Sequence, residues 1–204
     1  MLTAIRHLTE LPAGMAGNIG GMKLASLPTR LSSQLGYTLL ELMTALSILG
    51  ILVAIGAPSF NEYTRNSRTL AAQNDFVTAL NLARNEAVRR SMRVTVCASS
   101  NGANCTGNTT WNNGWIVFQD GSGAMGTVDA NDRVLQVYRD YPAAIVDIPA
   151  ATALGFYSFT STGTAAQAGV LEMQPHTCPT GVQKRRQVTV VGIGSIRSQL
   201  INCT

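Results

Sequence analysis

Residues 37–60 read YTLLELMTALSILGILVAIGAPSF and decide how the chain is organised. This stretch of 24 residues contains one charged side chain, that of Glu41. A helix of this length is about 36 Å long, and the hydrocarbon core of a bilayer is about 30 Å thick. The composition of the whole chain, with 46% hydrophobic and 13% charged residues, is typical of a protein with a membrane segment. The stretch therefore predicts a helix that can cross a membrane.

A short basic leader precedes this stretch. Residues 22–36 read MKLASLPTRLSSQLG, and Met22 is an alternative start to Met1, which would make residues 1–21 an upstream extension. An ordinary secretory signal peptide is one interpretation, because Ala54-Ile55-Gly56 offers a small-x-small cleavage site before Ala57. The apolar run is longer than the roughly 7–15 residues of a signal peptide, which argues against this interpretation.

Glu41 is the second argument against a simple signal peptide. A charged side chain costs about 2.5–3.5 kcal/mol at the centre of a membrane span, and less near its end. Such a carboxylate needs a partner, and the nearest candidate is an amine that cleavage before Tyr37 would create. That amine would lie at the positive end of the helix dipole. A simpler role for Glu41 is a capping carboxylate within the first turn of its own helix, and the two roles are compatible.

The segment Gly36-Tyr37-Thr38-Leu39-Leu40-Glu41 resembles the class III signal of type IV prepilins and type II secretion pseudopilins. The resemblance implies that prepilin peptidase cleaves between Gly36 and Tyr37 and that Tyr37 becomes N-methylated; the family usually has Phe at that position. It also implies that Glu41 pairs with the terminal amine of an adjoining subunit, which sets the register of apolar helices in a filament. Pro58 falls where the family carries a helix-loosening proline.

Residues 61–92 have the pattern of an amphipathic helix. Apolar side chains recur at spacings of three, four and seven, and arginines are interleaved on other faces. Glu86 and Arg90 form an i,i+4 pair in the favourable order. We expect this helix to continue the membrane helix apart from a bend at Pro58, and to pack one face on the rest of the chain. The apolar positions are Leu70, Phe76, Val77, Leu80, Ala83 and Ala87, and the arginines are Arg65, Arg68, Arg84, Arg89 and Arg90.

Residues 93–204 have the pattern of short strands separated by turn residues. Val94-Thr95-Val96 and Val188-Thr189-Val190 alternate as half-buried strands do, and Trp115 and Phe118 are predicted to be core residues. The sequence thus predicts an α+β fold in which one long N-terminal helix packs on an antiparallel β-sheet head. Its parts are a leader at 1–36, an assembly helix at 37–60, an amphipathic helix at 61–92 and the head at 93–204. The expected strands are 93–98, 115–119, 133–138, 154–159, 170–173, 187–191 and 195–201.

All four cysteines lie in the head, which indicates two disulfides formed outside the cytosol. Four cysteines allow three pairings, of which Cys97–Cys105 and Cys178–Cys203 are favoured because each pair flanks one local feature. Free buried thiols are the alternative. A zinc site is disfavoured, because the sequence has no CxxC pair and only His176 lies nearby.

The head also resembles a known group. The segments 86–90 (EAVRR), 94–97 (VTVC) and 114–120 (GWIVFQD) are similar to the H-type pseudopilin and FimT/FimU minor-pilin head. This resemblance implies a minor subunit that initiates, caps or decorates a type IV pilus or a type II secretion pseudopilus. It implies single-pass insertion in the inner membrane with the head in the periplasm. The implied partners are other pilins or pseudopilins, prepilin peptidase and an inner-membrane assembly platform.

Catalytic and metal chemistry find little support in the sequence, and we expect no enzyme activity, cofactor or metal. Carboxylates in the glycine-rich segment 120–132 would suit calcium, but the EF-hand spacing is absent and a solvated connection between strands is the better interpretation. His176 lies two residues from Cys178, and nothing marks a third group that would complete a catalytic triad.

Nucleic-acid binding is the alternative function. Lys184, Arg185 and Arg186 form a basic run, and Arg197 follows a short strand later, although the net charge of +4 does not by itself imply a nucleic-acid partner. FimT-like pilins that take up DNA carry a G-R-x-R motif, which the segment 194–197 matches with Ser195 in place of the first arginine. A solvated loop is the simpler interpretation of the basic run.

Overall fold

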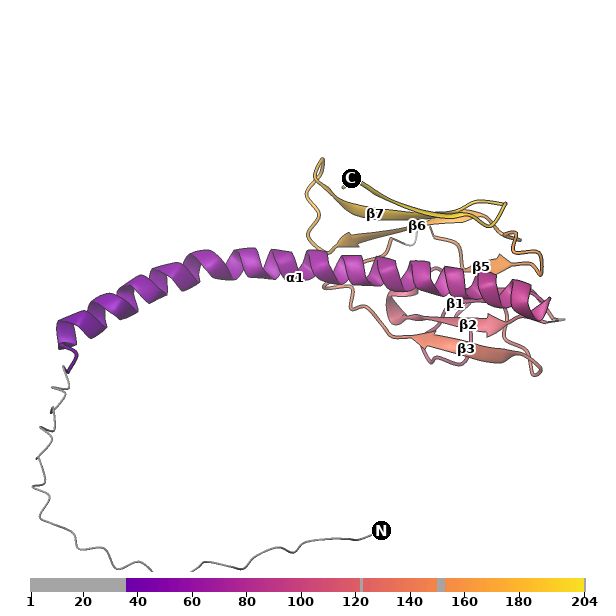
Figure 1. Cartoon of the computed structure of the whole chain (residues 1–204), viewed down its shortest axis with the longest axis horizontal. Helices are drawn as coiled ribbons and strands as arrows, with labels where there is room; N and C mark the ends of the chain where they lie inside the picture. The colour runs from indigo at the N-terminus through magenta and orange to yellow at the C-terminus, as the bar shows by residue number, and fades with distance from the viewer. Residues whose placement is uncertain (1–35, 122, 150–152, 204) are drawn as a thin grey trace, which may run out of the picture. The chain divides into compact units, whose positions relative to one another are not determined.

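A computed structural model describes residues 36–121, 123–149 and 153–203 (Figure 1). The predicted leader lies outside the described residues except for Gly36. One helix, α1 (Leu39–Arg90), joins the two predicted helical segments and continues through Pro58, beginning two residues later and ending two residues earlier than predicted. From Ala45 onward the helix and the head form one compact unit.

Local hydrogen bonds define both ends of α1. At its start Glu41 N donates to Thr38 Oγ1 at 3.2 Å, and Leu42 N donates to Thr38 O at 3.1 Å, so Thr38 is the N-cap. At its end Ser91 adopts a φ of 54°, and Met92 N donates to Ala87 O at 3.2 Å. Left-handed residues of this kind commonly terminate helices.

The last turn of α1 carries the predicted ion pair. Glu86 binds Arg90 at 2.5 Å and also Arg89 at 2.6 Å. These contacts lower the pKa of Glu86, with the hydrogen bond from Arg89 as the largest cause and that from Arg90 next.

The head contains two four-stranded antiparallel sheets. The first has the order β3-β2-β1-β5 and the second the order β4-β6-β7-β8. The predicted bounds of β2 and β3 are correct, whereas β4 was not predicted, because two residues carry no periodic pattern. The strands are β1 (Val94–Ala98), β2 (Trp115–Gln119), β3 (Arg133–Tyr138), β4 (Val146–Asp147), β5 (Phe156–Phe159), β6 (Gly169–Pro175), β7 (Gln183–Val190) and β8 (Ile196–Asn202), with a short 3-10 helix at Trp111–Asn113.

One hydrophobic core joins both sheets to the C-terminal half of α1, which lies between them in Figure 1. The helix contributes a single buried stripe, and each sheet contributes alternate residues of its inner face. Leu70 was predicted to belong to this stripe but is 40% exposed, because it lies on another side of the helix. The buried helix residues are Ala72, Phe76, Ala79, Leu80, Ala83 and Ala87.

Aromatic rings form the centre of this core. Phe76 meets the rings of Trp111, Trp115 and Tyr157 edge-on, with centroids 5.3–5.6 Å apart. Trp111 Nε1 donates to Leu154 O at 2.8 Å, and the hydroxyl of Tyr157 donates to Val170 O at 2.9 Å. Tyr157 lies on β5 and Val170 on β6, so the latter bond links the two sheets.

The first sheet is also covered on its outer face. Cys97, Ile116 and Phe118 form a second buried cluster there, and the disulfide Cys97–Cys105 lies in it. All of β1 is therefore buried, whereas its alternation predicted a half-buried strand. Trp115 and Phe118 are both core residues, as predicted, but they face opposite sides of the sheet.

Candidate functional site

The N-terminal part of α1 has an exposed apolar surface. This helix is long and apolar enough to cross a membrane, and its most apolar stretch has no buried residue. Between Leu39 and Ile55 the large apolar side chains are 55–76% exposed. Tyr37 is 84% exposed, and Glu41 is exposed in the first turn. A segment of this kind is stable only when lipid or other apolar helices cover it.

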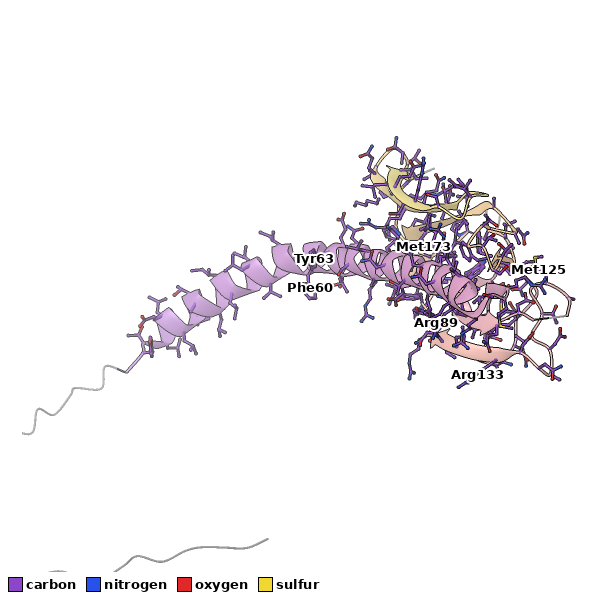
Figure 2. All side chains as sticks on the ribbon, turned by 45° about the vertical axis from the view of Figure 1, so that its right-hand side comes forward. Phe60, Tyr63, Arg89, Met125, Arg133 and Met173 are labelled. Atoms are coloured by element: carbon purple, nitrogen blue, oxygen red, sulfur yellow. A yellow bond between two sulfur atoms is a disulfide. The ribbon has the colours of Figure 1, made fainter. Side chains whose placement is uncertain are left out.

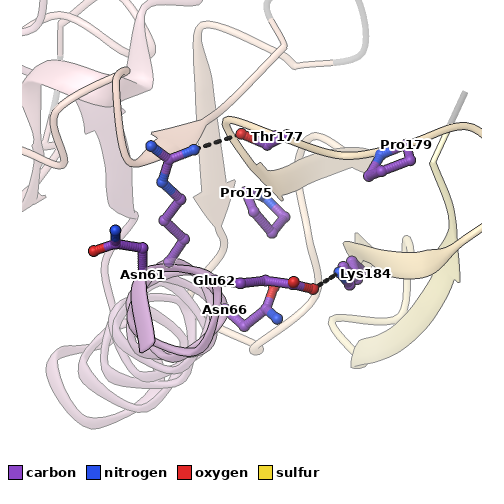
Figure 3. A pocket seen from close by; sticks show the side chains of 8 residues that line it. Asn61, Glu62, Asn66, Pro175, Thr177, Pro179 and Lys184 are labelled. Atoms are coloured by element: carbon purple, nitrogen blue, oxygen red, sulfur yellow. Dashed lines mark hydrogen bonds and ion pairs between the residues drawn. The ribbon is translucent and has the colours of Figure 1, made fainter. Parts of the chain in front are cut away.

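A pocket of about 330 Å³ lies where α1 meets the connection between β6 and β7 (Figure 3). Lys184 Nζ donates to Glu62 Oε1, and Arg65 Nη1 donates to Thr177 Oγ1 at 2.5 Å. The hydrogen bond and the positive charge of Lys184 lower the pKa of Glu62. The lining residues are Asn61, Glu62, Arg65, Asn66, Pro175, Thr177, Pro179 and Lys184.

Two exposed aromatic residues on α1 lie next to the pocket residues in sequence. Phe60 is 70% exposed and Tyr63 is 71% exposed, and Figure 2 shows both on the part of the helix that precedes the head. The pocket was not predicted from the sequence, because its lining joins two segments more than a hundred residues apart. The only local indication of this site in the sequence was the pair Phe60 and Tyr63, at and just beyond the end of the apolar run.

The basic run 184–186 belongs to strand β7 and is not a solvated loop. A bulge lies between Gln183 and Arg185. Lys184 and Arg186 both contact α1. Arg186 Nη1 donates to Gln73 Oε1 at 3.2 Å, and the buried Arg185 donates to Glu172 Oε2. The run therefore does not form a continuous basic surface, because its members contact side chains of α1 and β6.

The segment 194–197 divides into a structural part and an exposed part. Arg197 is exposed on β8, opposite Thr189 of β7. Gly194 has a φ of 81° and lies against the backbone of Gly163, whose carbonyl oxygen accepts a 3.0 Å hydrogen bond from Arg84 Nε. The glycine of this motif thus joins two turns to the helix.

Two carboxylates of segment 120–132, those of Asp120 and Asp132, accept hydrogen bonds within the head. Asp120, predicted to belong to a solvated connection, is fully buried. Its carboxylate accepts hydrogen bonds from Arg93 at 2.5 Å, Thr95 at 2.7 Å and the amide of Gly126 at 3.0 Å. Among the residues that the structure describes, no group of three or more His, Cys, Asp or Glu could hold a metal ion. Asp120 therefore anchors the loop by its own hydrogen bonds.

The remaining predicted residues of the head are the four cysteines and His176. The structure contains the disulfides Cys97–Cys105 and Cys178–Cys203, the pairing that the sequence favoured. The second bridge ties the β6–β7 connection to the residue that follows β8. His176 is exposed in the same connection.

Two protein-family models and a fimbrial protein match parts of the chain. A family model described as type II transport protein GspH matches residues 72–194, and one described as a prokaryotic N-terminal methylation motif matches residues 31–57. A fimbrial protein of Pseudomonas aeruginosa is 33% identical over 69 residues, which cover 34% of this chain and 44% of that protein. This chain thus spans less than half the length of that relative.

Two solved structures are similar to the chain. The type IV minor pilin FimU of Pseudomonas aeruginosa has a TM-score of 0.49 and 19% identity, over 67% of this chain and 92% of FimU. The minor pseudopilin EpsH of the type 2 secretion system of Vibrio cholerae has a TM-score of 0.38 and 15% identity, over 65% of this chain and 97% of EpsH.

Proposed function

Because this chain belongs to the GspH family of type II transport proteins, a family of minor pilins and pseudopilins, we propose that it initiates, caps or decorates a filament of such subunits. The observation that carries the proposal is the apolar stretch of α1, whose large side chains are exposed between Leu39 and Ile55 and which has one acid, Glu41, in its first turn. Neighbouring helices of the same kind would cover this surface in a filament. The role is structural and not catalytic.

Processing supplies the partner for Glu41. Cleavage between Gly36 and Tyr37 by prepilin peptidase leaves a cationic amine at Tyr37, which becomes N-methylated. Thr38 caps the helix with its own hydroxyl, so the Glu41 carboxylate is exposed to a neighbour. Pairing Glu41 with the Tyr37 amine of another subunit would relieve the desolvation cost of both charges within an apolar filament core.

The same apolar surface supports a membrane location for the chain before it is assembled into a filament. We place the apolar stretch of α1 in the inner membrane and the disulfide-bonded head in the periplasm, where disulfides form. The assembly platform in that membrane would then pass the subunit to the filament.

Substitution of Glu41 tests the proposal. The Glu41→Ala variant is expected to be processed normally, with Tyr37 as its first residue, and to be absent from sheared filaments. An unpaired buried charge costs about 3–5 kcal/mol, enough to exclude a subunit. Glu86→Ala is the matched control, because it removes an acid from the same helix outside the apolar stretch. Normal assembly of Glu41→Ala, or a mature chain that begins at Ala57, would contradict the proposal.

DNA binding is the second candidate, and one observation favours it. Arg197 is exposed on β8 at the position that matches the second arginine of the G-R-x-R motif. Lys184 and Arg186 instead contact Glu62 and Gln73 of α1, and Arg185 contacts Glu172 of β6. With one matching cation exposed, the expected affinity is low and its salt dependence is shallow, because the slope scales with the number of phosphates neutralised.

A further inference from the structure

The pocket between α1 and the β6–β7 connection lies at a defined distance from the apolar stretch. The apolar stretch ends at Phe60, and the helical lining of the pocket lies at residues 61–66. At about 1.5 Å per residue these positions extend roughly 9 Å beyond Phe60. The polar headgroup layer on each side of a bilayer is about 5–8 Å thick. In a membrane-anchored chain the pocket therefore lies at the level of the lipid headgroups.

The exposed aromatic residues support this depth independently. Tryptophan and tyrosine side chains gather at membrane–water interfaces, where an amphipathic ring is stable. Phe60 and Tyr63 are both more than two-thirds exposed, although large aromatic side chains are usually buried in a soluble head. Tyr63 lies between the first and last helical residues of the pocket, so the interface that suits Tyr63 also contains the pocket.

The lining has the chemistry of a phosphate site. It contains two cations, Arg65 and Lys184, and one carboxylate, Glu62, so the charged side chains sum to a positive charge. Arg65 donates one of its five N–H groups to Thr177, a neutral partner, and Lys184 donates one of its three to Glu62. The volume of about 330 Å³ lies at the lower end of the range for ligand pockets, which suits a headgroup more than a whole lipid.

We infer that this pocket binds the phosphate of an anionic membrane-lipid headgroup, with Arg65 and Lys184 as its cationic contacts. The inference rests on the proposed membrane anchoring and adds a ligand to it. Because Glu62 already occupies one donor of Lys184, Arg65 provides the larger share of the attraction. The lipid would hold the base of the head against the bilayer before the subunit joins a filament.

Native mass spectrometry of the full chain in mixed micelles tests the inference. The micelles contain equal amounts of phosphatidylglycerol and phosphatidylcholine with the same acyl chains, and the measured quantity is the ratio of the two lipid adducts. We expect the unaltered chain to retain phosphatidylglycerol preferentially. Arg65→Gln should lower the ratio about fivefold, the effect of one cation near an anionic lipid. Glu62→Gln should raise it, because the competing carboxylate is lost.

Arg68→Gln is the matched control, since Arg68 is an exposed arginine of the same helix outside the pocket. Equal losses in Arg65→Gln and Arg68→Gln would mean general surface attraction and would overturn the inference. If inorganic phosphate displaces phosphatidylglycerol, the pocket binds free phosphate, and the inference that its ligand is a lipid headgroup would be overturned. If Arg65→Gln leaves the ratio of the two lipid adducts unchanged but abolishes filament assembly, the pocket binds a protein partner and not a lipid. Each of these results leaves the membrane anchor intact, whereas a chain that fails to enter micelles would overturn both proposals.

Discussion

Replacement of Gly194 by alanine is expected to be among the more damaging single-methyl changes in the head. Gly194 lies in the turn between β7 and β8, with a φ of 81°. A Cβ atom at this position would lie 1.9 Å from the carbonyl oxygen of Gly163 and 3.1 Å from Arg84 Nε. The first contact is with backbone, so a side-chain rotation cannot relieve it. The two turns would have to separate, which disturbs the hydrogen bond between Arg84 and Gly163.

The expected loss of stability has two parts. An alanine in the left-handed region costs about 1–2 kcal/mol. Forcing an additional methyl group into a packed contact costs about 1–3 kcal/mol more. The sum, about 2–5 kcal/mol, is a large fraction of the roughly 5–15 kcal/mol by which a domain is stable. For a chain of this size, each kcal/mol lowers the melting temperature by about 2–4 °C.

Two other glycines separate the causes. Gly181 has a φ of 84° and open space around its Cβ position. Gly181→Ala should therefore lose only the stability that an alanine costs in the left-handed region. Gly192 has open space and no positive φ, so Gly192→Ala should change the free energy of unfolding little. The assay is urea unfolding of the full chain in detergent, followed by the fluorescence of the buried Trp111 and Trp115. If Gly194→Ala and Gly192→Ala unfold at the same urea concentration, the steric reasoning is refuted.

Two further predictions concern charged residues. Because Lys184 lowers the pKa of Glu62, the ion pair stabilises the head above the carboxyl group's unfolded pKa, and the stabilisation is lost as pH falls through the lower folded value. NMR titration of Glu62 in Lys184→Gln should show its pKa raised toward the ordinary value, and an unchanged pKa would show that the pair does not form in solution. If the chain binds DNA, Arg197→Gln should reduce the salt dependence in a gel-shift titration of the full chain by about one phosphate contact, with a change in slope of about 0.9. Arg133→Gln, at an exposed arginine of β3, is the control, and an equal change in both variants would exclude a specific role for Arg197.

The elements that could be predicted from the sequence are those with strong local patterns. The bounds of β2 follow from the turn residues before Trp115, since Gly114 has a φ of 101° that ends the preceding 3-10 turn. The burial of Thr95 could not be predicted, because it depends on a loop elsewhere in the chain that covers the outer face of the sheet. Thr95 donates to Asp120 at 2.7 Å, a partner 25 residues away. An alternation of apolar and polar residues shows that one face of a strand is buried, but it does not show whether the opposite face is also covered.

The same limit applies to the candidate sites. The processing motif and Glu41 are contiguous in sequence and could be recognised there. The Glu62–Lys184 ion pair joins positions 122 residues apart, and it depends on how β7 packs against α1. A basic run alone cannot show whether its charges face solvent or carboxylates of the same molecule.

The contacts of that run bear directly on what the head does. Lys184 and Arg186 reach Glu62 and Gln73, which lie on α1 about three turns apart. These two side chains therefore hold the second sheet against the part of α1 that contains the buried residues Thr69 and Ala72. A cation that leaves such a contact for a phosphate would loosen the helix from the sheet. Using β7 for DNA would thus work against the rigidity that a filament subunit needs. Arg197 instead lies exposed on the edge strand β8, and a nucleic-acid function would depend on this residue.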